Sequence, residues 1–340
     1  MQQNIKRYAK MTIAALKNEH NTCIHVNSDC FAQVCEYTNT EHEALYFGAK
    51  NTAALKPLIS KLQGNAYFYH TIDALADNGR AIDIKLRNPL TDRAMSGSSS
   101  GSAINVFYGI NDIGIGSDGG GSVLAPAMSL NLFSLISPLL PITQLDKIST
   151  DGIKFAPVAG IIAHNFKHFI QTVEYLLLEK KPKPKAKISI LCQENFTKLD
   201  GDSNFQVTKM PFPDINGPRA ILIAWCTQKL KLYDIIISEE GPIDCLEYGD
   251  TLQGIFSEKN TKEQQKAGKG LLRIVAMSKA TAITIPKLAK AEGYVLIANS
   301  TPRDIYNLLE VGKIVEQPFP EIIKKYFHQS YNKRENNIIF

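Results

Sequence analysis

Two segments rich in serine and glycine, residues 96–102 and 116–122, hold the residues best suited to chemistry. Each adjoins an apolar segment, which argues against a flexible linker. In the second segment three successive glycines precede Ser122. Glycines allow neighbouring backbone N–H groups to converge on one point, and such donors stabilise a developing oxyanion. The serine adds a nucleophilic hydroxyl, which needs a nearby base to take its proton.

A nucleotide-binding loop is the main alternative, because Gly114, Gly116 and Gly119 match the pattern G-x-G-x-x-G. A dinucleotide site also needs a strong strand before the loop, a helix after it and an acidic residue about 20 positions on. Here the preceding strand is short, Pro126 interrupts the following helix, and residues 136–141 contain no acid. A P-loop would need Gly-Lys-Ser/Thr, which is missing. The oxyanion loop is therefore the favoured interpretation.

Taken together, the two segments resemble the signature of the amidase signature family. Its first hallmark is Gly-Gly-Ser-Ser-Gly-Gly-Ser-Ala, and residues 96–103 read Ser-Gly-Ser-Ser-Ser-Gly-Ser-Ala. Its second is Gly-Thr-Asp-x-Gly-Gly-Ser-Ile-Arg-x-Pro, and residues 116–126 read Gly-Ser-Asp-Gly-Gly-Gly-Ser-Val-Leu-Ala-Pro. Weaker similarity at residues 46–51, 75–85 and 282–286 extends the resemblance from residue 24 to residue 312. The resemblance implies an amide hydrolase of the non-peptide type.

The same resemblance implies a Ser–cis-Ser–Lys triad. Ser122 would be the acylated nucleophile, Ser99 the bridging serine held by a cis peptide bond, and Lys50 the base. Serines replace two glycines of the first segment, so Ser98 stays open as the bridging residue. Ser99 is preferred because it lies three residues before Ser102. A lysine base must be neutral, and burial lowers its pKa, so a dry site is expected.

The resemblance also assigns the oxyanion hole to the backbone N–H groups of Gly119, Gly120 and Gly121. Asp118 is interpreted as an acceptor that braces the loop. Leu124 stands where the family has an arginine, and the chain is shorter than usual members. These two departures leave open a catalytically silent or partner-dependent amidase-fold subunit.

Other side chains could also take part in chemistry. His70 could accept a proton at neutral pH, but an ordinary histidine at the start of a helix is preferred. Lys85 fits a non-catalytic lysine of the family. His164 and His168 are four residues apart, without an accompanying cysteine or carboxylate. No metal site is expected from this pair.

The elements that must position these residues alternate between strands and helices, which predicts an α/β fold with a mixed sheet core flanked by helices. Strands are predicted at residues 45–47, 81–84, 113–115, 188–191, 220–225, 282–285 and 294–298. Helices are predicted at residues 4–18, 70–78, 103–108, 169–178, 304–310 and from 271 onward. Residues 179–187 are expected to be an exposed linker and residues 259–269 a surface loop. A single domain is expected over residues 1–330, with a polar tail at 331–340.

Composition narrows the function classes. The 340 residues are 44% hydrophobic, as in globular proteins, and their charge of +5 includes no basic stripe typical of nucleic-acid binding. No apolar stretch reaches the roughly 18 residues of a membrane span. The six cysteines contain no C-x-x-C pair, which favours reduced thiols in the cytoplasm. We expect a cytoplasmic enzyme for a small-molecule amide, without a cofactor, a nucleic acid or a membrane; a homodimer or a partner subunit stays open.

Overall fold

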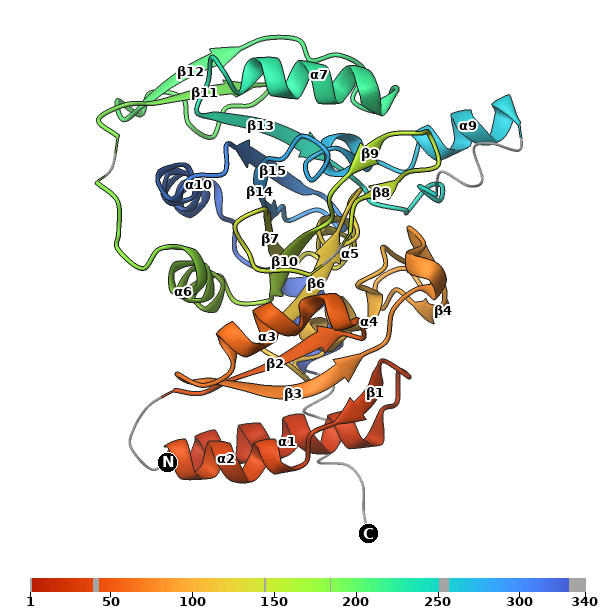
Figure 1. The fold of residues 1–340 in the computed structure, drawn as a ribbon, viewed down its shortest axis with the longest axis vertical. Coiled ribbons are helices and arrows are strands. Elements are labelled where there is room, and N and C mark those ends of the chain that lie inside the picture. The colour runs from red at the N-terminus through yellow and green to blue at the C-terminus, as the bar shows by residue number, and fades with distance from the viewer. Residues whose placement is uncertain (1, 39–42, 144, 184, 251–256, 330–340) are drawn as a thin grey trace.

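The computed structural model describes residues 2–38, 43–143, 145–183, 185–250 and 257–329. Its centre is a mixed sheet of 11 strands (Figure 1). Pairing is parallel along β3-β2-β6 and β13-β11-β12 and antiparallel at the other neighbours. In spatial order the strands are β1 (Cys23–Val26), β3 (Tyr67–Asp73), β2 (Leu45–Lys50), β6 (Ile113–Asp118), β10 (Val158–Ala163), β7 (Phe133–Ser137), β14 (Thr281–Pro286), β15 (Gly293–Ala298), β13 (Ile235–Glu240), β11 (Ile188–Cys192) and β12 (Phe205–Lys209). The predicted α/β fold with a mixed sheet is confirmed.

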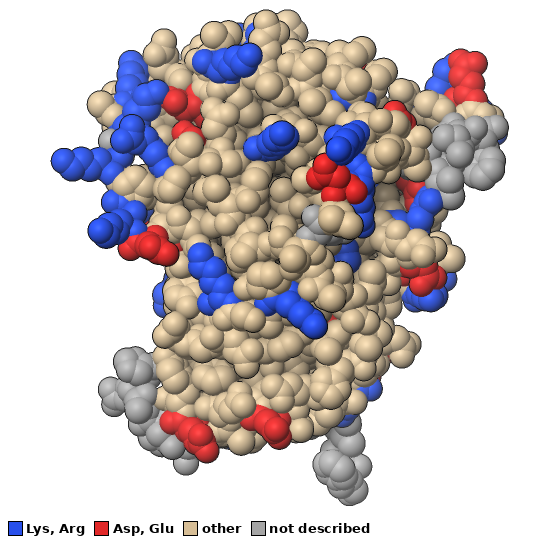
Figure 2. Space-filling model, viewed as in Figure 1, with Lys and Arg blue, Asp and Glu red and all other residues tan. Residues whose placement is uncertain are grey.

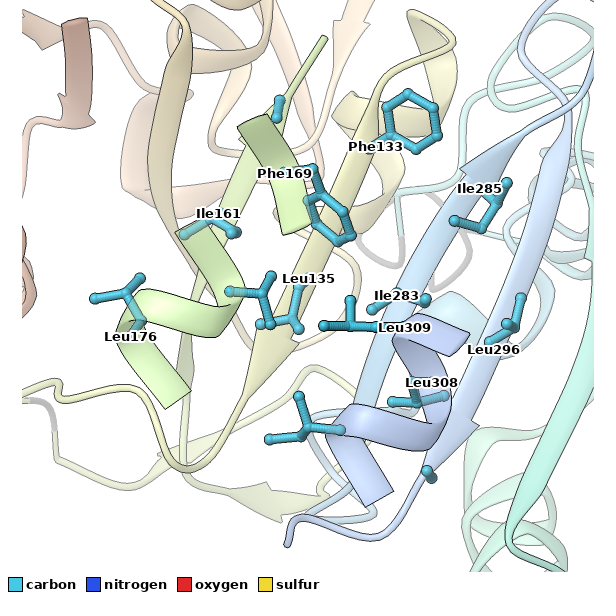
Figure 3. Close-up of a cluster of buried hydrophobic side chains, with 14 of the residues drawn as sticks. Phe133, Leu135, Ile161, Phe169, Leu176, Ile283, Ile285, Leu296, Leu308 and Leu309 are labelled. Carbon is cyan, nitrogen blue, oxygen red and sulfur yellow. The ribbon is translucent and has the colours of Figure 1, made fainter. Parts of the chain in front are cut away.

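Helices cover both faces of this sheet. On one face lie α3 (Lys56–Leu62), α6 (Phe166–Leu177) and α10 (Pro302–Val315), which share one buried hydrophobic cluster with the strands. Figure 3 shows Phe169 of α6 and Leu308 of α10 pointing toward Leu135 and Ile283 of the sheet. Each such fully buried side chain contributes about 1.5–3 kcal/mol of transfer free energy.

The opposite face carries α4 (Ser100–Phe107), α5 (Leu124–Ser129) and α7 (Arg219–Lys229), joined to the strands by a second cluster. Helices α1 (Gln2–Lys17) and α2 (Asp29–Thr38) pack together beside β1 and β3 at one end of the sheet (Figure 1). Helix α4 packs against β6 and α5. The segment 96–102 ends in the first turn of α4, and the segment 116–122 begins in β6 and leads into α5.

Shorter elements lie outside the main sheet. Two hairpins are formed by β4 (Ile82–Arg87) with β5 (Ala94–Ser96) and by β8 (Lys147–Ile148) with β9 (Lys154–Phe155). The remaining short helices are η1 (Ala53–Leu55), η2 (Asp77–Gly79), α9 (Glu258–Gln265), η3 (Gly270–Arg273), α11 (Glu321–Ile323) and η4 (Lys324–Gln329). Hairpin β8–β9 projects toward α9 in Figure 1.

Three predicted elements were wrong. Residues 70–78 begin in strand β3, because their backbone pairs with β1 and β2 on both sides. Residues 220–225 belong to helix α7, where Leu222 and Cys226 are buried four positions apart while Ile221 stays exposed. Residues 259–269 include helix α9, whose N-cap Ser257 accepts a hydrogen bond from the Asn260 N–H. The helix expected from residue 271 is a single turn, η3.

Lysine and arginine side chains are spread over the face shown in Figure 2 and form no continuous stripe there. The described residues of the linker at 179–187 are exposed, as predicted, except for the half-buried Pro182. None of the described helices is long and apolar enough to cross a bilayer. The predicted tail at residues 331–340 lies outside the described residues.

Candidate active site

The site forms where two neighbouring parallel strands end. Strands β2 and β6 pair with Gly48 opposite Gly114, so Lys50 at the end of β2 lies beside the end of β6. The segment 116–122 continues from that end of β6 into helix α5. Ligand sites in α/β sheets commonly lie beyond the carboxyl ends of parallel strands. The fold thus brings the base candidate Lys50 to residues 116–122, which are called the nucleophile loop after the candidate nucleophile Ser122.

The two serine- and glycine-rich segments touch each other. The Ser99 N–H donates to the Ser122 carbonyl oxygen at 3.1 Å. Gly97 has φ +66°, and a Cβ there would lie 2.5 Å from Cδ of Pro126. A Cβ on Gly116 would lie 2.3 Å from the Ser99 hydroxyl. Glycine is therefore required at both positions to let the two loops pack together.

Lys50 contacts Ser98. Its Nζ lies 2.6 Å from Ser98 Oγ and 3.2 Å from Ser117 Oγ. The Lys50 side chain is buried, with 5% of its surface exposed. Burial lowers the pKa of Lys50 to about 8, although the nearby Asp118 carboxylate opposes that change. A neutral amine is therefore accessible near neutral pH.

Ser99 does not occupy the position predicted for it. Its side chain is fully buried, and its Oγ has no hydrogen-bond partner among the described residues. The cis peptide bond found in the described chain precedes Pro242, so the bonds flanking Ser99 are trans. Ser98 lines the cavity that Lys50 and Ser122 also line, and Ser99 does not. The reason is local: Ser99 is the N-cap of α4, and its side chain packs against Gly116 of β6.

Asp118 braces the nucleophile loop. Its carboxylate accepts the N–H groups of Gly121 at 2.7 Å, Val123 at 2.6 Å and Leu124 at 3.2 Å. Burial raises the pKa of Asp118, and these donors oppose that rise. Because the Gly121 N–H is used in this way, it is not available as the predicted oxyanion donor.

The other two predicted donors remain at the cavity. Gly119 and Gly120 line it, together with the half-buried Ser122. A Cβ on Gly119 would lie 2.2 Å from the ring of Phe155 in hairpin β8–β9. Glycine at this position therefore lets the hairpin close over the loop. The Gly119 and Gly120 N–H groups are the candidates for an oxyanion hole.

The cavity above this loop has a volume of about 310 Å³. That lies at the small end of the range for small-molecule sites. Its wall includes residues that the sequence did not single out, among them Ser117, Phe155, Arg219 and Arg273. The two arginines are about 100 and 150 residues from Ser122 along the chain, and no local pattern marks them.

The remaining candidates lie elsewhere. His70 is buried inside strand β3, where its Nδ1 lies 2.8 Å from Asn111 Oδ1. Burial lowers the pKa of His70 to about 4, and its ring does not line the cavity. His168 Nε2 lies 3.2 Å from Glu43 Oε1. Lys85 is paired with Asp77 on the surface.

Part of the chain matches a known protein family by sequence. The family model described as Amidase matches residues 80–135, which include both serine- and glycine-rich segments. No curated protein matches the chain significantly.

Solved structures resemble the whole fold. An amidase superposes with a TM-score of 0.65 at 12% identity, covering 92% of this chain and 94% of that one. The allophanate hydrolase of Kluyveromyces lactis gives a TM-score of 0.61 at 13% identity, covering 92% of this chain and 69% of that one. A 6-aminohexanoate cyclic dimer hydrolase, solved with its substrate, gives a TM-score of 0.60 at 12% identity, covering 92% of this chain and 95% of that one.

These similarities agree with the motifs. At such identities the structural likeness shows the fold, and the family match adds the segment that carries Ser98 and Ser122. The family match over residues 80–135 supports amide hydrolysis in general as the activity. The resemblance to the amidase signature family is therefore confirmed, by the match over residues 80–135 and by the fold of the whole chain.

Proposed function

We propose that this protein hydrolyses a small-molecule amide through an acyl-enzyme on Ser122. Lys50 is the base and Ser98, in place of Ser99, relays the proton. The observation that carries this proposal is the 2.6 Å contact between Lys50 Nζ and Ser98 Oγ. It lies in a cavity whose wall also includes Ser122, Gly119 and Gly120.

The proposed reaction gives each of these residues one role. Ser122 Oγ attacks the amide carbonyl carbon while its proton passes to Ser98 and the Ser98 proton passes to neutral Lys50. The Gly119 and Gly120 N–H groups hold the oxyanion of the tetrahedral intermediate. When that intermediate collapses, the C–N bond breaks and the amine leaves with the proton returned from Lys50. Water then attacks the acyl-enzyme, using the same relay, and releases the acid.

The lowered pKa of Lys50 supports its role as the base. At a pKa of about 8, roughly a tenth of the lysine is neutral at pH 7, whereas at its ordinary value well below 0.1% would be. Contact with the Ser117 hydroxyl fixes the amine on the side of the cavity. Buried Leu124 provides no cation here, so the positive charge in the cavity wall comes from other parts of the chain.

Covalent labelling tests the proposal. The protein is treated with a neutral fluorophosphonate, its intact mass is measured, and the labelled peptide is sequenced. We expect one adduct on Ser122 and none in Ser122→Ala. Ser129→Ala is a matched control, because Ser129 is a buried serine of α5 outside the cavity.

The same assay separates the proposal from a catalytically silent subunit. A silent subunit would remain unlabelled although folded, as judged by its thermal unfolding. Labelling that persists in Ser122→Ala would also contradict the proposal, because the nucleophile would then be another residue.

A further inference from the structure

Two arginines line the same cavity as the nucleophile loop. Arg219 begins helix α7 and Arg273 ends the turn η3. A Cβ on Gly120 would lie 3.2 Å from Arg219 Nη1 and 3.7 Å from the Arg273 carbonyl oxygen. One guanidinium group and the backbone of η3 therefore lie directly beside the proposed oxyanion donors.

Arg219 is held by one carboxylate. Its Nε donates to Asp151 Oδ2 at 2.8 Å, and its Nη2 donates to the other oxygen of the same group. Only 8% of the Arg219 side chain is exposed. Its Nη1, which faces Gly120, has no hydrogen-bond partner among the described residues. This edge of the guanidinium is free to bind a ligand.

Arg273 is held by neutral groups. Its Nε donates to the Gly270 carbonyl at 3.0 Å, and its Nη2 donates to the carbonyls of Ile215 at 2.8 Å and Gly217 at 3.1 Å. Carbonyl oxygens orient a guanidinium without cancelling its charge. Burial lowers the pKa of Arg273, and the neighbouring Arg219 adds to that effect. The pair thus presents two cations with one directly bonded carboxylate, and an anion placed between them would be stabilised.

The Glu240 and Asp214 carboxylates act on Arg273 from outside the cavity wall, without a hydrogen bond to it. The other described charges of the wall are not bonded to either arginine. Arg80 donates a hydrogen bond to each oxygen of the Asp250 carboxylate, so the charges of these two side chains compensate each other. Lys147 is exposed on hairpin β8–β9 and solvated. Asp118 keeps its negative charge, but its carboxylate faces the backbone of residues 121–124, and its charge acts on Lys50 in the same wall.

We infer that the substrate of the proposed reaction carries a carboxylate, and that this group binds on Arg219 and Arg273. Its amide carbonyl then lies on the N–H groups of Gly119 and Gly120. Because Arg219 Nη1 is beside Gly120, the carboxylate and the scissile amide are joined by a short spacer. Guanidinium groups recognise planar carboxylates in a bidentate way, which fixes the amide relative to Ser122. This inference rests on the proposed function.

Matched substrates test it. Malonamate, succinamate and glutaramate are each compared with the diamide of the same length, in which a neutral carboxamide replaces the carboxylate at nearly equal size. We expect wild type to favour at least one acid over its diamide by tenfold or more in kcat/KM, the usual size of one charged hydrogen-bonded contact. In Arg273→Gln that preference falls to less than about threefold, mainly through KM.

A matched variant controls for charge alone. Lys147→Gln removes the same charge from the exposed rim of the same cavity and should keep the preference. Equal rates for acids and diamides in wild type would overturn the inference. A preference that survives in Arg273→Gln would overturn it too.

Failure of the proposed function is recognised separately. If no amide is hydrolysed and Ser122 is not labelled, binding is measured by thermal unfolding with succinate and with succinamide. Stabilisation by succinate alone, lost in Arg273→Gln, supports the anion site without the reaction. No stabilisation by succinate contradicts the site itself.

Discussion

Replacing the two adjacent serines by alanine separates their roles. Ser98 Oγ is 2.6 Å from Lys50 Nζ, whereas Ser99 Oγ has no hydrogen-bond partner among the described residues. Ser98→Ala therefore removes the proposed relay, and Ser99→Ala removes a hydroxyl that makes no such bond. Proton relay by a positioned side chain contributes about 10²–10⁴-fold in rate, or about 3–5 kcal/mol of barrier.

We expect Ser98→Ala to lower the rate of Ser122 labelling by about 10²-fold or more. Ser99→Ala should stay within about threefold of wild type, because its N–H still bonds to the Ser122 carbonyl. The assay is the pseudo-first-order rate of fluorophosphonate labelling by intact mass at pH 8.5. Thermal unfolding of both variants controls for folding, since each serine is buried. A large loss in Ser99→Ala with a small one in Ser98→Ala would refute this assignment.

Three further changes probe the loop. Gly119→Ala forces Phe155 away, so we expect about tenfold slower labelling, restored by adding Phe155→Ala; failure of that rescue would count against the steric explanation. Asp118→Asn replaces an acceptor of three backbone N–H groups, so the free energy of unfolding, measured with denaturant, should fall by about 3 kcal/mol. An unchanged denaturation midpoint would show that these hydrogen bonds do not stabilise the loop. Leu124→Arg puts an unpaired charge into a fully buried apolar cluster, so it should lower Tm by several degrees instead of restoring a helpful cation, and an unchanged Tm would contradict this.

The sequence predicted strands β2 and β14 well, because both are buried, mostly apolar runs of strand length. It misassigned helix α7, since a short apolar run does not distinguish a strand from a helix that is buried on one side. It also missed α9, whose eight residues are all polar and so give no hydrophobic periodicity. That helix has the N-cap Ser257 and the surface ion pair Lys262–Glu258 instead.

The candidate site was predictable only in its local part. The loop ending at Ser122 and the strand ending at Lys50 each have a sequence signal. Neighbouring serines have the same chemistry, however, and only the start of α4 decides that Ser98 faces the cavity. Arg219 and Arg273 reach the loop through the packing of α7 and η3, which no local spacing encodes.

The central claim is that Lys50 activates Ser122, and the pH dependence of Ser122 labelling tests it most directly. The pKa of Lys50 is lowered to about 8, so the neutral, active form of the amine increases as the pH rises through that value. The labelling rate of wild type should rise between pH 7 and 9 and then level off. Lys50→Met should be slower by about 10²-fold or more and lack that rise. A profile with the same midpoint and similar rates in both proteins would contradict the account.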